Sequence, residues 1–223
     1  MKTFIKKFNI LIKKIIFKVE NITNNKSQIS NFNKYLITFI SLLFFYLFYL
    51  SIPILYNKLS IQNNIENQLS KEFGINFSVS SDITYRILPA PHFLFKDSKI
   101  FKNGSNKMVS LADVKNLRIF ISQKNFLNKK KITIKHIKID NANFSMLKGD
   151  LKFFKDLGNE KFSKKKVEIT KSNIFFKDNL NNILAFIKVS KAIFLLDDKN
   201  LFKLKGKIFN MPFSFDFFKK FDS

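Results

Sequence analysis

The chain has 223 residues and is strongly basic, with 40 Lys and Arg against 16 Asp and Glu and a formal net charge of +24. It contains no cysteine, which excludes disulfides, thiolate metal sites and a cysteine nucleophile. Lys, Asn, Ile and Phe are abundant. An AT-rich genome encodes such a bias at surface positions that tolerate substitution. The charge is therefore either a feature that binds phosphates or anionic lipid headgroups, or a product of composition, and both interpretations stay open.

Residues 1–34 form a basic arm with eight lysines and one acid, Glu20. Apolar residues recur in it at spacings of three and four: Phe4, Phe8, Leu11, Ile12, Ile15, Ile16 and Val19. This spacing predicts an amphipathic helix on an anionic leaflet. The alternative is a lysine-rich, disordered topology signal, because positive charge beside a membrane helix is by itself enough to keep that side in the cytoplasm.

Residues 35–56 are 22 residues without a charge, and at about 1.5 Å per residue they reach roughly 33 Å, enough for a hydrocarbon core of about 30 Å. We predict one transmembrane helix there. A cleaved signal peptide is the main alternative, but the run is too long, begins late and lacks a small-x-small cleavage pattern. The lysines of the arm predict a cytoplasmic N-terminus and an exported remainder. Four tyrosines suit interfacial positions: Tyr35, Tyr46, Tyr49 and Tyr56.

A helix is predicted over residues 57–74, directly after the anchor. Its apolar residues recur every four positions, and Gly74 stands at the expected C-cap: Ile61, Ile65, Leu69 and Phe73. This helix would act as a stalk or as a lid.

From Ile75 the apolar period changes to two, which predicts a pair of strands with one apolar face and a bend at Ser80–Asp82. Pro89 and Pro91 end this pairing, because proline donates no ladder hydrogen bond. Further strands are predicted at 93–101, 114–122, 131–139, 142–147, 167–177, 184–196, 202–209 and 211–217. The apolar positions change parity around His136, which indicates a bulge. The part of the chain from 75 to 223 is thus predicted to be one mainly β domain.

The order of these features resembles the N-terminal region of the AsmA family of bacterial envelope proteins, relatives of TamB and of chorein-like lipid-transfer proteins. The resemblance rests on the glycine that leads into an alternating strand, on the proline-containing segment and on two later strand patterns: Phe73–Val79 with Asp82-Ile83, Ile87–Asp97, Leu111–Ser122 and Ile132–Phe144. It covers Lys34 to Leu147 well and Val167 to Phe217 more loosely. Better-known members continue further, so we expect a short form or a truncated gene product.

The resemblance implies an elongated, curled antiparallel sheet with an apolar concave face that shields acyl chains. Phospholipid or another envelope lipid would be the ligand, and the bacterial inner membrane would hold the anchor, with the β domain in the periplasm. The candidate groove residues are Ile75, Phe77, Val79, Ile83, Tyr85, Ile87, Phe213 and Phe215. Plain core packing is the alternative for any one of them.

No motif in the chain predicts catalysis, a cofactor or a metal site. The two histidines, His92 and His136, stand 44 positions apart, outside any metalloprotease, deaminase, Walker or dinucleotide pattern. Specific nucleic-acid binding is not expected either, because the basic bulk lies on the predicted export side. The alternative function is an anchored scaffold that pairs with another envelope protein through an open edge strand near 211–217 and carries no lipid.

Overall fold

A computed structural model of the chain describes residues 13–14, 31–102, 110–128, 132–147, 165–196 and 199–220. The chain divides into two compact units, Met1–Phe48 and Tyr49–Ser223. The amphipathic helix predicted for the basic arm lies outside the described residues, apart from two helical positions, Lys13 and Lys14. Most of the connection between residues 147 and 166 is also outside them.

Helix α2 (Asn31–Ser51) continues into a short 3₁₀ helix, η1 (Ile52–Leu55). Within the described residues, Asn31–Leu55 is the single helical segment long and apolar enough to cross a membrane, judged by length and composition. Only 11% of its apolar window is buried, unlike the core helix of a soluble protein. The predicted span, 35–56, starts four residues later than α2, and its last residue, Tyr56, is buried in the second unit.

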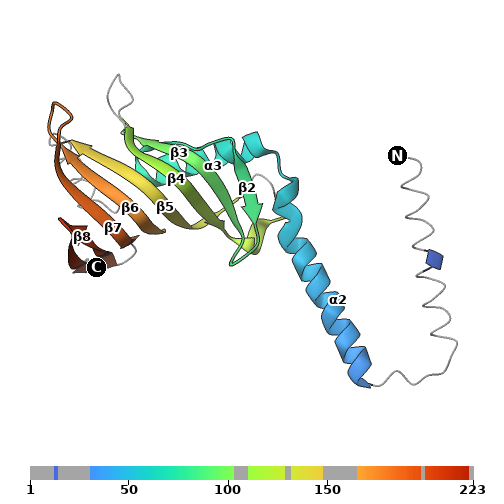
Figure 1. The fold of residues 1–223 in the computed structure, drawn as a ribbon. Coiled ribbons are helices and arrows are strands. Elements are labelled where there is room, and N and C mark those ends of the chain that lie inside the picture. The colour runs from blue at the N-terminus through green and yellow to red at the C-terminus, as the bar shows by residue number, and fades with distance from the viewer. Residues whose placement is uncertain are drawn as a thin grey trace. The chain divides into compact units, whose positions relative to one another are not determined.

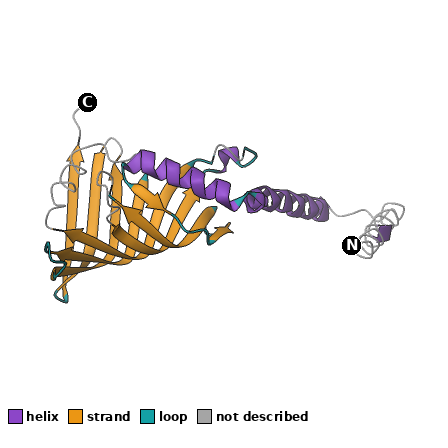
Figure 2. Ribbon diagram, turned by 90° about the horizontal axis from the view of Figure 1, so that it is seen from above, coloured by secondary structure: helices purple, strands orange, loops and turns teal. Residues whose placement is uncertain are grey.

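Helix α3 (Lys58–Phe73) has the boundaries that its sequence predicts. The side chain of Asn57 caps its N-terminus by accepting a hydrogen bond from the Ser60 amide, and Gly74 ends it in the left-handed region at φ +63°. Its buried residues fall on one stripe, every fourth position: Ile61, Ile65, Leu69 and Phe73. Because this stripe packs against the sheet, α3 covers part of one sheet face, as in the lid arrangement (Figure 2).

Nine strands form one mixed sheet that curls without closing (Figure 1). They are β1 (Asn76–Ser78), β2 (Ile83–Arg86), β3 (His92–Phe101), β4 (Ser110–Ile121), β5 (Ile134–Leu147), β6 (Lys166–Lys177), β7 (Ile183–Leu196), β8 (Lys199–Ile208) and β9 (Met211–Lys220). The short strands β1 and β2 do not pair with each other. Both pair with β3, one after the other along the same edge, because the bend at Ser81 keeps the chain running in one direction.

The prediction of an antiparallel sheet is wrong at one pair of strands. β5 and β6 pair in parallel, whereas all the other neighbours are antiparallel. A parallel pair needs a crossover of about a dozen residues or more, and the eighteen residues from 148 to 165 are long enough for one. The predicted bulge at His136 is confirmed, because the register of β4 and β5 shifts there.

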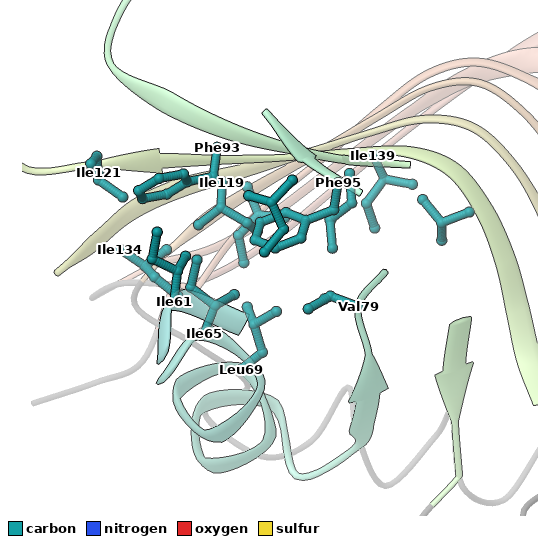
Figure 3. Packing of buried hydrophobic residues seen from close by; sticks show 14 of the residues in the cluster. Ile61, Ile65, Leu69, Val79, Phe93, Phe95, Ile119, Ile121, Ile134 and Ile139 are labelled. Carbon is teal, nitrogen blue, oxygen red and sulfur yellow. The ribbon is translucent and has the colours of Figure 1, made fainter. Parts of the chain in front are cut away.

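The core lies between α3 and the first strands of the sheet (Figure 3). Ile61, Ile65 and Leu69 point from the helix toward Phe93, Phe95 and Ile119 of the sheet. All six side chains are at most 3% exposed. We call the side of the sheet on which α3 lies the α3 face.

A crease crosses the sheet where several strands leave the extended conformation. Asp97, Asn141 and Lys171 have left-handed backbones, with φ of 54°, 59° and 49°. They are level with one another across the sheet, since the cross-strand pairs on either side of the crease place Asp97, Asn141 and Lys171 in line with Lys115 of β4. The side-chain alternation is interrupted at the crease, so apolar residues stay on the α3 face on both sides of it.

Ser172 satisfies a backbone group beside the crease. Its hydroxyl accepts a hydrogen bond from the Ala142 amide at 3.0 Å and donates one to the Thr170 carbonyl at 2.8 Å. The side chain is fully buried, where an unpaired amide would cost about 1–3 kcal/mol. A serine on an otherwise apolar face therefore stabilises the bend of the parallel β5–β6 pair.

The crease predicts unequal effects for one substitution at two exposed lysines. Lys171→Val should lower the free energy of unfolding by about 1–3 kcal/mol, because a β-branched side chain is strained at positive φ. Lys188→Val, on the extended neighbouring strand β7, should be close to neutral, since valine favours strands. Thermal unfolding of the purified variants in detergent tests this. Equal losses at the two positions would contradict the proposed role of the left-handed backbone.

Candidate functional site

Apolar side chains on the α3 face form three rows that run across the sheet from strand to strand. In each row, every residue is the direct cross-strand partner of the next. Row 1 is Tyr85, Phe93, Ile119, Ile137, Val167, Phe194, Phe202 and Phe217. Row 2 is Ile83, Phe95, Leu117, Ile139, Ile169, Ala192, Leu204 and Phe215. Row 3 is Phe77, Ile100, Ala112, Phe144, Ile174, Ile187, Ile208 and Met211.

Each row is more exposed at its β9 end than on the strands that α3 covers. Row 1 is buried from Phe93 to Val167, is half-buried at Phe194 and Phe202, and is exposed at Phe217. The other two rows end in the same way, with Phe215 48% exposed and Met211 66% exposed. Among the described residues, the apolar surface thus becomes more open toward β9. We call the α3 face of β6–β9 the uncovered surface, on which Val167, Ser172, Val189 and Ala192 are buried and the larger apolar side chains are half-buried or exposed.

Aromatic rings pack across the strands of the uncovered surface. The rings of Phe194 and Phe202 stack at 4.6 Å, and those of Phe202 and Phe215 are tilted with their centroids 5.8 Å apart. Their contacts join β7, β8 and β9 into one aromatic floor. Such a surface offers broad, non-polar contact without directional hydrogen bonds, which suits an aliphatic ligand.

The candidate groove residues fall into two groups at opposite ends of the sheet. Ile75, Val79 and Ile83 are buried in the core, while Phe77, Tyr85 and Ile87 pack against it. Phe213 and Phe215 lie on β9, at the other end of the sheet. The sequence prediction placed all eight on one apolar surface, and the structure gives these two groups different surroundings: the first packs in or against the core, whereas Phe213 is half-buried and Phe215 is exposed.

The uncovered surface also contains residues that the list of candidates omitted. Most come from β6, β7 and β8: Ile169, Ile174, Ile187, Phe194, Phe202, Leu204 and Ile208. Period-two alternation was visible in each of these strands. The sequence did not show the register of the strands. The register determines which of these residues are cross-strand neighbours.

The opposite face of the sheet carries several of the ion pairs, while Lys165 pairs with Glu72 of α3 at 2.7 Å. Glu168 lies between Lys138 at 3.2 Å and Lys191 at 3.8 Å, nitrogen to oxygen. Burial opposes the charged form of Glu168, but the hydrogen bond and charge of Lys138 outweigh it and lower the pKa of the carboxyl. Lys203 and Asp216 pair across β8 and β9 at 3.6 Å. The Lys138–Glu168 contact is partly buried and the Lys203–Asp216 pair is exposed, and each joins neighbouring strands.

The two histidines pack against one phenylalanine on this face, His136 stacked on it and His92 tilted. The ring centroid of Phe120 lies 4.8 Å from that of His92 and 3.9 Å from that of His136. Burial lowers the pKa of both imidazoles, and the positive charges of Arg118 and Arg86 near His92, and of Lys166 near His136, act in the same direction. The neutral forms are favoured. In the parts of the chain that the structure describes, no three His, Asp or Glu side chains gather to hold a metal ion.

The comparison with protein families decides the assignment. The model of the AsmA family matches residues 29–200, well over half of the chain. The chain belongs to the AsmA family. No curated protein matches the sequence. The matched residues of this AsmA-family chain take in α2, α3 and strands β1–β7, so the membrane-helix candidate, the cover and most of the three rows all fall within the family region.

Proposed function

We propose that this AsmA-family chain is anchored in the bacterial inner membrane by α2 and binds phospholipid acyl chains on the uncovered surface of its periplasmic β domain. The observation that carries the proposal is the continuity of the three rows. The same apolar rows that pack under α3 continue over four more strands, where most of their larger described side chains are half-buried or exposed. Large apolar surfaces of this kind mark sites of lipid or partner binding.

The dimensions of the uncovered surface suit an acyl chain. Three interstrand spacings of about 4.8 Å make it roughly 14 Å wide, and ten residues of β8 make it about 33 Å long. An acyl chain in a bilayer covers about half of the hydrocarbon core, or roughly 15 Å. The surface therefore has room for an acyl chain in the direction of the strands.

The proposed action is local. Eight strand positions lie across the sheet, so seven spacings of about 4.8 Å give roughly 34 Å along the curl, less than the 40–45 Å of one bilayer with its headgroups. A bridge between two membranes needs continuous cover, because each exposed CH₂ costs about 0.8 kcal/mol. We infer that the chain extracts or presents lipid at the inner membrane, or supplies the first segment of a longer assembly, in support of outer-membrane assembly or homeostasis.

A second candidate function is supported by the edge of the sheet at β9. Within the described residues β9 pairs with β8 alone, and it exposes apolar side chains on both faces: Phe215 and Phe217 on one, Phe218 on the other. Leu201, the partner of Phe218, extends the apolar area on the face opposite α3. A strand with two apolar faces and an open edge suits the addition of a protein strand.

One experiment separates the two functions. A photo-reactive amino acid at Phe215, in the full chain purified from membranes with mild detergent, should crosslink to phospholipid, and mass spectrometry should find lipid in near-stoichiometric amounts. Capture of one protein with no bound lipid would favour the β9 scaffold. Capture of neither would contradict both functions, because it would mean that Phe215 is covered within the chain itself.

A further inference from the structure

Two tyrosines attach the loop between β4 and β5 to the end of the membrane-helix candidate. The hydroxyl of Tyr49, in the last turn of α2, donates to the Gln123 carbonyl at 2.5 Å, and that of Tyr56 donates to the Phe126 carbonyl. The ring of Tyr49 also stacks on Phe126 with a centroid distance of 5.6 Å. All four residues belong to the second unit. The loop is thus held beside the point where the helical span ends, at Leu55.

A third tyrosine attaches the loop between β2 and β3 to the same point. The hydroxyl of Tyr85, at the end of β2, donates to the Leu50 carbonyl at 2.6 Å. Burial raises the pKa of this phenol, so it keeps its proton and remains a donor at any physiological pH. Both loops therefore lie at the level where the chain leaves the apolar span.

Both loops expose leucine at their tips. Leu88 is 79% exposed and Leu127 is 80% exposed, and Leu55 at the end of the span is 77% exposed. Pro89 and Ala90 beside Leu88 are exposed as well, so the tip of this loop has no polar side chain. Loops in water normally expose polar residues, and apolar tips without a protein cover are unusual there.

The charges near these tips are positive. Lys124 in the β4–β5 loop and Lys58 at the start of α3 are exposed. No Asp or Glu occurs in residues 49–58, 87–91 or 122–128. Apolar side chains flanked by lysines and free of carboxylates match the boundary of a bilayer, where acyl chains meet anionic headgroups.

We propose that Leu88, Leu127 and Leu55 form a membrane-seated rim, which inserts into the headgroup boundary of the leaflet from which α2 emerges. The rim fixes one end of the strands at the bilayer. The β domain therefore keeps one orientation relative to the membrane and does not rotate freely about a single helix. This inference rests on the proposed anchoring by α2, but it does not depend on lipid bound to the uncovered surface.

The chain provides a matched control at the other end of the strands. Leu180 is 82% exposed, in a turn in which the Asp178 carboxylate accepts hydrogen bonds from the Leu180 and Asn182 amides. β6 begins beside the start of β5, near the rim, and runs parallel to it. Leu180 therefore lies beyond the far end of a strand of twelve residues, which at roughly 3.3 Å per residue is about 40 Å long.

Single-cysteine labelling tests the rim, because the natural chain has no cysteine. Leu88→Cys, Leu127→Cys and Leu180→Cys variants of the full chain are labelled with an environment-sensitive fluorophore and reconstituted into vesicles of phosphatidylethanolamine and phosphatidylglycerol. Spin-labelled phospholipid should quench the probes at 88 and 127 to less than about half their intensity, as expected for groups at the headgroup boundary. Aqueous iodide should quench the probe at 180 instead.

Flotation of the vesicles separates failure of the rim from failure of the anchor. If the protein floats and the probes at 88 and 127 are as open to iodide as the probe at 180, the rim proposal is overturned and the anchor stands. If lipid quenches all three probes equally, the rim is also overturned, because the domain would then lie flat. A protein that does not float would overturn both proposals.

Discussion

Ile65→Asp is expected to unfold the β domain. Ile65 is fully buried on α3, where it faces Phe93, Phe95 and Ile119 of the sheet (Figure 3). A carboxylate without a partner in this place costs several kcal/mol, a large part of the 5–15 kcal/mol that stabilises a typical domain. Loss of α3 would also expose the buried ends of the three rows to water. We expect aggregation on expression, or loss of the cooperative thermal transition in detergent.

Two further variants separate the effect of a buried charge at Ile65 from the loss of its side chain and from the addition of a charge to α3. Ile65→Ala should lower the free energy of unfolding by about 2–5 kcal/mol and leave a folded protein, because it removes methyl groups but adds no charge. Asn67→Asp adds the same carboxylate to the exposed side of α3 and should be close to neutral. If Ile65→Asp melted at the same temperature as Asn67→Asp, the role of α3 as a packed cover would be wrong.

Phe202→Asp is expected to remove bound lipid from the uncovered surface. Phe202 is the half-buried centre of the aromatic floor, between Phe194 and Phe215. A charge on a surface that contacts lipid costs about 2.5–3.5 kcal/mol, which corresponds to a loss of affinity on the order of a hundredfold. Quantitative mass spectrometry of phospholipid that co-purifies with the full chain measures this loss.

Ser214→Asp is the control for the Phe202 experiment. Ser214 lies on β9 with its side chain on the face opposite α3, and its cross-strand partner is Lys205, which can pair with the new carboxylate. Bound lipid should not change. Phe215→Asp, at a more exposed position of the same floor, should lose lipid while it keeps its thermal transition, which separates loss of ligand from unfolding. Equal lipid content in all three variants would contradict lipid binding on this face.

The local features of the fold could be predicted from the sequence because each depends on residues close together in the chain. The stripe from Ile61 to Phe73 and the stop at Gly74 give α3 without reference to the rest of the molecule. Alternation with period two gives β6, β7 and β9 nearly to their ends. The apolar run after Lys34 likewise needs only length and composition to be assigned as a membrane-helix candidate.

The crease shows where the local pattern was misleading. Residues 131–139 and 142–147 were predicted as two strands because the alternation breaks between Ile139 and Ala142. The structure has one strand, β5, with Asn141 in the left-handed region. In the sequence, a turn between two strands and a bend within one strand break the period of two in the same way. Only the pairing with β4 and β6 on both sides of Asn141 shows that β5 is one bent strand.

Two tyrosines at the end of the anchor also have partners that the sequence does not indicate, and these partners position the rim. Tyr49 and Tyr56 were predicted to suit interfacial positions. In the structure their hydroxyls also hold the loop at 122–128, a contact that was not predicted. These hydrogen bonds join residues 70 and 74 positions apart, and no sequence pattern indicates such partners.

By itself, the sequence determined the membrane-helix candidate, the helix that follows it, most of the strands and the apolar side of each, because these follow from short-range periodicity. The tertiary structure decided the parallel pairing of β5 and β6, the alignment of apolar residues into three rows, and the point at which α3 stops covering them. Register and cover are long-range properties, since a strand can pair with several partners without any change in its own pattern. The division of one apolar face into a core and an uncovered surface was therefore visible only in the folded chain.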